Sequence, residues 1–271
     1  MVQLEPNFTL VLKHLASCGA VIPAEQQAAL DHSLPIKRIE AGLKTLVLWG
    51  RITALNGKDY LIAEGFNTAT SKDGLATYET KYFYSQDGAR WSDLQPVDPD
   101  TAVRCARIKG QLSGDAAKNY ELTEKDPNAP EPVEGEEQEK EPEPLVFQIS
   151  ELSVLRYRVD SITAATSVIP TDSTIVNAAS QVVPNRLFAG CAYPEKLEAY
   201  QHRTAAPGSG ATLAQDLRGT WCVHYDSFKG VAQVRSLLWP GYFFYYAANE
   251  LTWGALYVGD GNRNNDLIFM L

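Results

Sequence analysis

Apolar residues near the start of the chain recur at the spacing of helices. Four of them lie three or four positions apart and share one helical face, namely Phe8, Val11, Leu12 and Leu15. Gly19 lies where such a helix would end, and Pro23 can open a second helix over residues 24–34. We therefore predict a helical N-terminal region over residues 1–44.

The pattern then changes to one that is typical of β-strands. Residues 45–55 and 59–66 are rich in β-branched and aromatic residues, and the Asn-Gly pair between them is a strong hairpin signal. Residues 77–94 predict two more strands around an Asp-Gly turn. Residues 98–112 predict a short helix that runs into a strand.

The middle of the chain combines a charged loop with helices. Ten acidic residues, five prolines and only two lysines lie between Glu121 and Pro144. Such a composition cannot form a packed core, so residues 115–144 predict a disordered acidic loop rich in proline and glutamate. Residues 193–203 are a helical candidate, and an earlier helix is predicted by the shared face of Leu152, Leu155, Val159 and Ile162.

Residues 215–271 predict an aromatic-rich C-terminal β region. Apolar and polar side chains alternate over residues 221–226, as in a strand with one buried side. The stretch RSLLWPGYFFYYA (residues 235–247) is apolar on both faces, so both faces should be covered. A Pro-Gly step interrupts it, since proline donates no ladder bond, and another strand follows at residues 252–259. We predict a single domain over residues 1–271 of the α+β class, mainly antiparallel β-sheet with short N-terminal and mid-chain helices.

The charge distribution narrows the class of partner. The 271 residues carry a net charge of −9, of which the segment from Glu121 to Pro144 contributes −8 and the remainder only −1. Because phosphate binding needs clustered lysine and arginine, we expect no nucleic-acid partner. The chain has no run of eighteen apolar residues and no leader pattern, so we expect no membrane span. It reads as a cytosolic protein whose four cysteines stay reduced.

Two pairs of residues could contribute to a metal site, but both are weak candidates. His14 and Cys18 are four residues apart on a predicted helix, and Cys222 and His224 share a strand face, but zinc needs three or four ligands. Residues 260–271 begin like a calcium loop, yet asparagine replaces the glycine expected at its sixth position. The sequence matches no phosphate-loop, hydrolase or metalloprotease motif. We therefore expect no catalytic, metal or cofactor site.

The aromatic stretch is therefore expected to lie either in the hydrophobic core or at an interface with a partner protein. Aromatic residues are strand formers that bury large areas, and they also concentrate at interface hot spots. An alternative is a β-sheet module that binds a small molecule or carbohydrate, which would expose its tryptophans. The candidate core or interface residues are Trp49, Trp221, Leu238, Trp239, Tyr242, Phe243, Phe244, Tyr245, Trp253, Tyr257 and Phe269.

Several segments resemble the radial spoke head protein 9 family. Leu237–Gly241 (LLWPG), Tyr257–Gly261 and Asp266–Leu271 are similar to the C-terminal signature of that family. Internal segments of the family resemble, in the same order, residues 47–52, 60–66 and 182–190. The acidic loop departs from the family's pattern.

The resemblance implies a non-enzymatic structural subunit of the radial spoke head in the axoneme of motile cilia and flagella. Its implied partners are radial spoke head proteins of the 4 and 6 type and other spoke-head subunits. The assembled head would contact central-pair projections transiently and relay signals that regulate dynein and the ciliary beat. The resemblance implies no catalytic residues and no cofactor.

Overall fold

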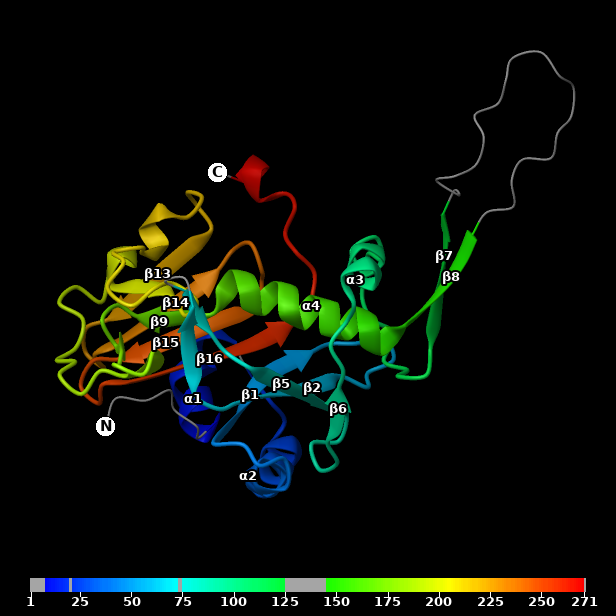
Figure 1. The fold of residues 1–271 in the computed structure, drawn as a ribbon, viewed down its shortest axis with the longest axis horizontal. Helices are drawn as coiled ribbons and strands as arrows, with labels where there is room; N and C mark the ends of the chain where they lie inside the picture. Colours follow the sequence, from blue (N-terminus) through cyan, green and yellow to red (C-terminus); the bar gives the residue numbers. More distant parts are fainter. Residues whose placement is uncertain (1–7, 20, 73–74, 125–144, 271) are drawn as a thin grey trace, which may run out of the picture.

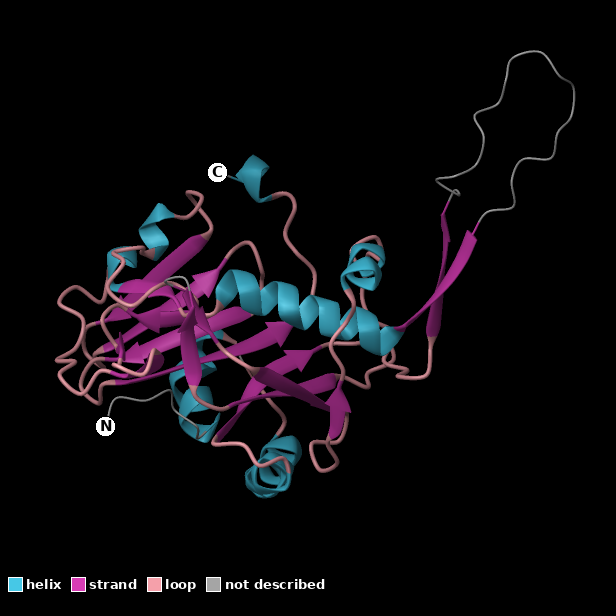
Figure 2. Ribbon diagram, in the orientation of Figure 1, coloured by secondary structure: helices cyan, strands magenta, loops and turns pink. Residues whose placement is uncertain are grey.

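The structure, a computed structural model, describes residues 8–19, 21–72, 75–124 and 145–270. It combines helices with largely antiparallel strands, so the predicted α+β class is confirmed (Figures 1 and 2). Short 3-10 turns occur at Ala16–Cys18, Leu197–Ala199, Leu213–Gln215 and Leu267–Met270. The helices are α1 (Phe8–Leu15), α2 (Ala24–Glu40), α3 (Pro99–Cys105) and α4 (Glu151–Thr166).

An eight-stranded sheet organises the described residues, in the order β13-β14-β15-β16-β1-β2-β5-β6. The N-terminal strands and the C-terminal strands each form an antiparallel group, and the two groups meet where β1 runs parallel to β16. The strands are β1 (Thr45–Ile52), β2 (Tyr60–Phe66), β5 (Thr80–Ser85), β6 (Ser92–Leu94), β13 (Trp221–Asp226), β14 (Val231–Ser236), β15 (Tyr242–Ala247) and β16 (Thr252–Gly259).

The parallel seam between β1 and β16 depends on a glycine. Gly50 lies opposite Tyr257 and has a φ of 152°, which side chains other than glycine rarely adopt. A Cβ added at Gly50 would overlap the Tyr257 carbonyl oxygen. The ladder between β1 and β2 also shifts register between Leu48 and Gly50. Such a bulge redirects side chains, and Trp49 Nε1 donates to Thr163 Oγ1 of α4 at 2.9 Å.

Both faces of the sheet are covered, as the two-sided apolar stretch predicts. On one face, Phe244 and Tyr246 of β15 belong to a large core that includes Val159 and Ile162 of α4. On the other face, Tyr245 belongs to a second core that contains the apolar side of α1. Figure 2 shows α4 crossing one face of the sheet with α1 and α2 on the opposite side. The sheet is therefore the middle layer between helices.

Strands that the sequence pattern does not predict make up smaller sheets. The helix predicted for residues 193–203 is wrong: this segment contains one 3-10 turn and the strand β12 (Tyr200–His202). The fully buried Tyr200 packs its ring against Phe244 at 5.6 Å, so tertiary packing overrides the local helical preference. Strand β12 pairs with β9 (Val168–Pro170). A four-stranded sheet contains β10 (Thr174–Val176), β11 (Gln181–Pro184), β3 (Ala69–Lys72) and β4 (Leu75–Thr77), in that order.

The predicted acidic loop begins later than residue 115. Asn119–Glu124 forms strand β7, which pairs with β8 (Leu145–Ser150) in an arm that extends from the body (Figure 1). Residues 125–144 lie outside the described residues. Two arginines support the arm. Arg104 of α3 lies 3.7 Å from the centre of the Phe147 ring, and Arg107, just after α3, donates to the Glu124 carboxylate at 2.9 Å. These contacts join segments that are distant in sequence, which explains why composition alone misplaces the boundary.

Two other boundaries differ from the sequence prediction. Helix α2 continues through Pro35 to Glu40, although proline usually ends a helix. The strand expected after α3 is reduced to a single bridge between Ala54 and Leu112.

The first residue of α4 is a fully buried carboxylate. Glu151 Oε1 accepts from the Tyr60 hydroxyl (2.8 Å) and from the Gly114 N–H (2.7 Å). Its Oε2 accepts from the Tyr120 hydroxyl (2.9 Å), the Ser113 N–H (3.1 Å) and the Ser113 hydroxyl. Burial alone would raise the pKa of Glu151, but these hydrogen bonds outweigh burial and lower it. The carboxylate thus joins α4 to β2, β7 and the loop before β7.

Candidate interaction surface

Strand β13 is a free edge of the eight-stranded sheet. All of its residues pair with β14, from Trp221 opposite Ser236 to Asp226 opposite Val231. Among the residues that the structure describes, no backbone hydrogen bond joins residues 222–225 to a segment other than β14. An edge strand presents N–H and C=O groups with which a further strand can pair.

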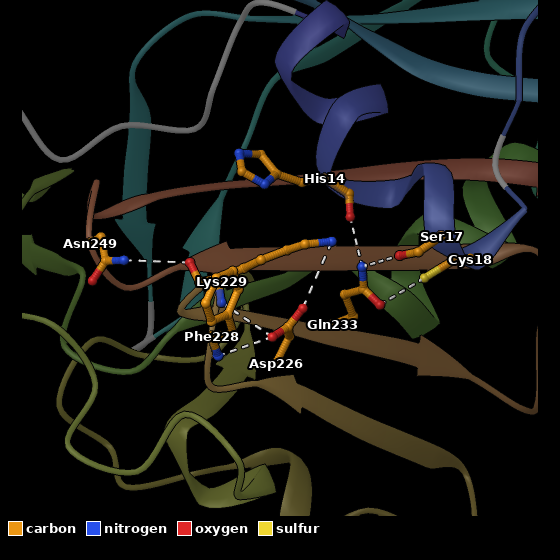
Figure 3. Close-up of polar contacts among 8 residues, drawn as sticks. All are labelled: His14, Ser17, Cys18, Asp226, Phe228, Lys229, Gln233 and Asn249. Carbon is orange, nitrogen blue, oxygen red and sulfur yellow. Dashed lines mark hydrogen bonds and ion pairs between the residues drawn. The ribbon is translucent and has the colours of Figure 1, made fainter.

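A fully exposed aromatic residue stands at the tip of the β13–β14 hairpin. Phe228 is 95% exposed. The turn beneath it is held by Asp226 Oδ1, which accepts from the backbone N–H groups of Phe228 (3.0 Å) and Lys229 (3.2 Å). Asn249 Nδ2 donates to the Lys229 carbonyl at 3.4 Å, and Gly230 closes the turn with a φ of 66° (Figure 3). An exposed aromatic side chain on a turn whose backbone is held in this way is the kind of residue that anchors protein interfaces.

A groove separates the hairpin from the N-terminal helix. Its volume is about 870 Å³. Gln233 of β14 forms its floor: Nε2 donates to the His14 carbonyl (2.7 Å) and Ser17 Oγ (2.8 Å), and Oε1 accepts from Cys18 Sγ (3.2 Å) (Figure 3). The amide therefore fixes the helix against the hairpin. We call this region the hairpin surface and define it by Lys13, Asp226, Phe228, Lys229, Gln233 and Arg235.

The hairpin surface is cationic in a protein of net charge −9. Lys13, Lys229 and Arg235 are all exposed on it, and Asp226 is its single carboxylate. Lys229 lies 3.8 Å from that carboxylate in an exposed pair, and within the described ranges neither Lys13 nor Arg235 forms an ion pair. Such a surface suits an acidic partner.

The first ligand pair considered in the sequence, His14 and Cys18, serves packing in the structure. The Cys18 thiol donates to Gln233, and burial raises its pKa, which disfavours a reactive thiolate. The His14 ring stacks on Tyr245 at 4.6 Å. Cys222 and His224 remain on one strand, and the described ranges contain no group of three or more histidine, cysteine or acidic residues placed to hold a metal.

The turn that resembles the start of a calcium loop is stabilised by hydrogen bonds among its own polar groups. Asp260 accepts from the backbone N–H (3.0 Å) and side-chain amide (2.9 Å) of Asn262. Asn264 Oδ1 accepts from the Asp266 N–H at 3.1 Å. These bonds are those of a capped surface turn.

Most of the aromatic candidates lie in the core and not on the surface. Trp49, Leu238 and Phe243 are half-buried, whereas Phe269 is 88% exposed. Phe228 is not among the sequence candidates, because it lies in a turn between two strands, where the sequence has no periodic signal. The buried candidates are Trp221, Trp239, Tyr242, Phe244, Tyr245, Trp253 and Tyr257.

Comparisons with known proteins find full-length relatives. The chain is 32% identical over 286 residues to the radial spoke head protein 9 homolog of Mus musculus, which covers 98% of this chain and 99% of the relative. The homologs of the same name from Bos taurus and Homo sapiens are each 31% identical with the same coverage. No protein-family model matches the chain. No helix in the described part of the chain is long and apolar enough to cross a membrane.

Proposed function

This chain belongs to the radial spoke head protein 9 family, and from that premise we propose that it is a structural subunit of the radial spoke head in the ciliary axoneme. The observation that carries the proposal is similarity along the whole length of both chains, and not at one motif. In this role the protein needs no active site. It contributes a rigid sheet between helices, and the assembled head relays central-pair signals that regulate dynein.

We propose that the hairpin surface binds a spoke-head protein of the 4 or 6 type through an acidic, extended segment of that partner. Three features support an acidic, extended segment as the binding partner of this surface. The edge of β13 can pair with one more strand, Phe228 offers an aromatic anchor, and the surrounding cations complement acidic side chains. The arm of β7 and β8 extends from the body (Figure 1). We propose that the acidic segment between these two strands in the sequence keeps contacts with central-pair projections transient.

A surface module for carbohydrate is less well supported. Such a module uses exposed tryptophans as a platform, but Trp221, Trp239 and Trp253 are each less than 9% exposed. Their burial is what a scaffold requires.

Co-expression with a 4- or 6-type spoke-head partner tests the proposal. Size exclusion with in-line mass determination should give a stoichiometric complex. Phe228→Ser should weaken it at least tenfold, whereas Phe269→Ser, at the other strongly exposed phenylalanine, should leave it intact. Arg235→Glu should weaken it most at low salt, since screening already reduces the attraction at high salt.

The results distinguish an error in the proposed contact site from an error in the proposed scaffold role. Complex formation that is lost only with Phe269→Ser would move the contact to the C-terminal end while keeping the scaffold role. A folded protein that forms no complex with any spoke-head subunit would contradict that role.

A further inference from the structure

A cavity of about 490 Å³ lies beside the end of α4, between the eight-stranded sheet and the four-stranded sheet. This volume falls within the roughly 300–1,000 Å³ of typical small-molecule sites, which combine apolar walls with a few placed polar groups. The hairpin surface plays no part in it. The wall of the cavity includes the aromatic side chains of Trp49, Phe66, Tyr78, Tyr242, Trp253 and Tyr257.

A buried ion pair forms the polar part of the wall. Arg203 Nη2 and Glu64 Oε1 are 2.5 Å apart, and the two side chains are 13% and 7% exposed. The Arg203 guanidinium also lies 4.7 Å from the centre of the Tyr78 ring. Burial would lower the pKa of Arg203, but the Glu64 carboxylate more than offsets this and raises it, so the guanidinium stays charged. Its Nε nevertheless has no hydrogen-bond partner among the described residues.

A second buried donor, on another residue that lines the cavity, is also unpaired. Trp253 is 3% exposed, and its indole Nε1 has no partner within the part of the chain that the structure describes. The indole N–H groups of Trp49, Trp91 and Trp221 all find oxygen acceptors. Buried polar groups are almost always paired, so two unpaired donors in residues that line one cavity point to an acceptor bound there.

The charges around the cavity specify the kind of acceptor. Arg38, Lys44 and Arg203 line it together with one carboxylate, that of Glu64, which leaves a net charge of +2. We propose that the cavity binds a small amphipathic carboxylate, whose apolar body lies against the aromatic walls and whose oxygens accept from Arg203 Nε and Trp253 Nε1. A carboxylate has acceptors only, whereas a neutral hydroxyl or amide would bring donors to a wall that already has too many. This inference does not depend on spoke-head assembly.

Calorimetric titration of the full chain with decanoate, below its micelle-forming concentration, tests the proposal. Saturable one-to-one binding is expected, and decan-1-ol should bind at least tenfold more weakly. Trp253→Phe removes the indole donor while keeping an aromatic wall, and should weaken decanoate binding at least fivefold. Trp91→Phe is the matched control, since the Trp91 N–H is already bonded to Ser33 away from the cavity, and should leave binding unchanged.

Several results would overturn the assignment. One is the absence of saturable decanoate binding, which would leave water as the partner of the two donors. The others are equal affinity for decanoate and decan-1-ol, and equal weakening of decanoate binding by both tryptophan variants. If circular dichroism shows that Trp253→Phe does not fold, Lys44→Gln serves instead, because Lys44 is exposed at the cavity and its loss should not affect folding. It should weaken decanoate binding at least threefold at low salt, and unchanged affinity would count against the proposal.

Discussion

Glu151→Gln is the substitution whose effect the structure specifies most closely. The wild-type carboxylate accepts five hydrogen bonds, two on Oε1 and three on Oε2. A glutamine amide has one oxygen, and its NH₂ group cannot accept. Hydroxyl donors can rotate and accept from the NH₂ group, but a backbone N–H cannot. Either orientation therefore leaves one buried N–H unpaired, that of Gly114 or that of Ser113.

The expected cost follows from these contacts. An unpaired buried donor costs about 1–3 kcal/mol, and the loss of charge weakens the remaining bonds, so we expect a total near 3 kcal/mol. For a chain of this size each kcal/mol lowers Tm by roughly 2–4 °C, which gives a decrease of roughly 6–12 °C at neutral pH. The exposed Glu79 offers the control, and Glu79→Gln should change Tm by no more than roughly 2 °C.

The pH dependence gives this prediction a second readout. Because folding lowers the pKa of Glu151, its contribution to stability is present above the unfolded pKa, roughly 4.3, and is lost as pH falls through the folded pKa. Urea unfolding of both proteins between pH 7 and pH 3.5 should show a stability gap that narrows below roughly pH 4.3. A gap of less than 1 kcal/mol at pH 7, or one that stays constant into acid, would refute the reasoning.

Two other predictions concern packing of the sheet. Gly50→Ala should abolish soluble expression or lower Tm by more than roughly 8 °C, because a Cβ there overlaps Tyr257. The control is Gly57→Ala, also at positive φ but in open space, which should lower Tm by only roughly 2–4 °C. Similar losses of Tm in the two variants would contradict the close approach of Gly50 to Tyr257. Leu15→Ala should lower the free energy of unfolding in urea by about 2–5 kcal/mol, because Leu15 is fully buried against the sheet. Lys13→Ala on the same helix should lower it by less than about 0.5 kcal/mol. Equal effects would mean that α1 does not pack on the sheet as described.

Local signals in the sequence predict the elements whose structure is decided locally. The apolar face of α1 is set by three- and four-residue spacing, and the hairpin of β1 and β2 by an Asn-Gly turn. The two-sided apolar pattern of β15 predicts its position inside the sheet, with Phe244 facing one core and Tyr245 the other.

Features that depend on distant pairing could not be predicted in this way. Tyr200 lies in a strand because Phe244 and a partner strand surround it, and nothing in its neighbours along the chain indicates this. Arg203 and Glu64 are 139 positions apart, so their ion pair has no local signature. The exposure of Phe228 becomes visible only when the hairpin is known to lie at the edge of the sheet.

Because β1 pairs with β16, the eight-stranded sheet cannot be completed until β16 has been synthesised. Gly50 and Tyr257 are 207 positions apart, so β1 leaves the ribosome long before its neighbour exists. At about 5–20 residues per second, that interval is roughly 10–40 s. During it one edge of β1 stays unpaired and open to aggregation, which makes the nascent N-terminal half a natural client for chaperones. A premature stop codon anywhere before β16 would make that exposure permanent.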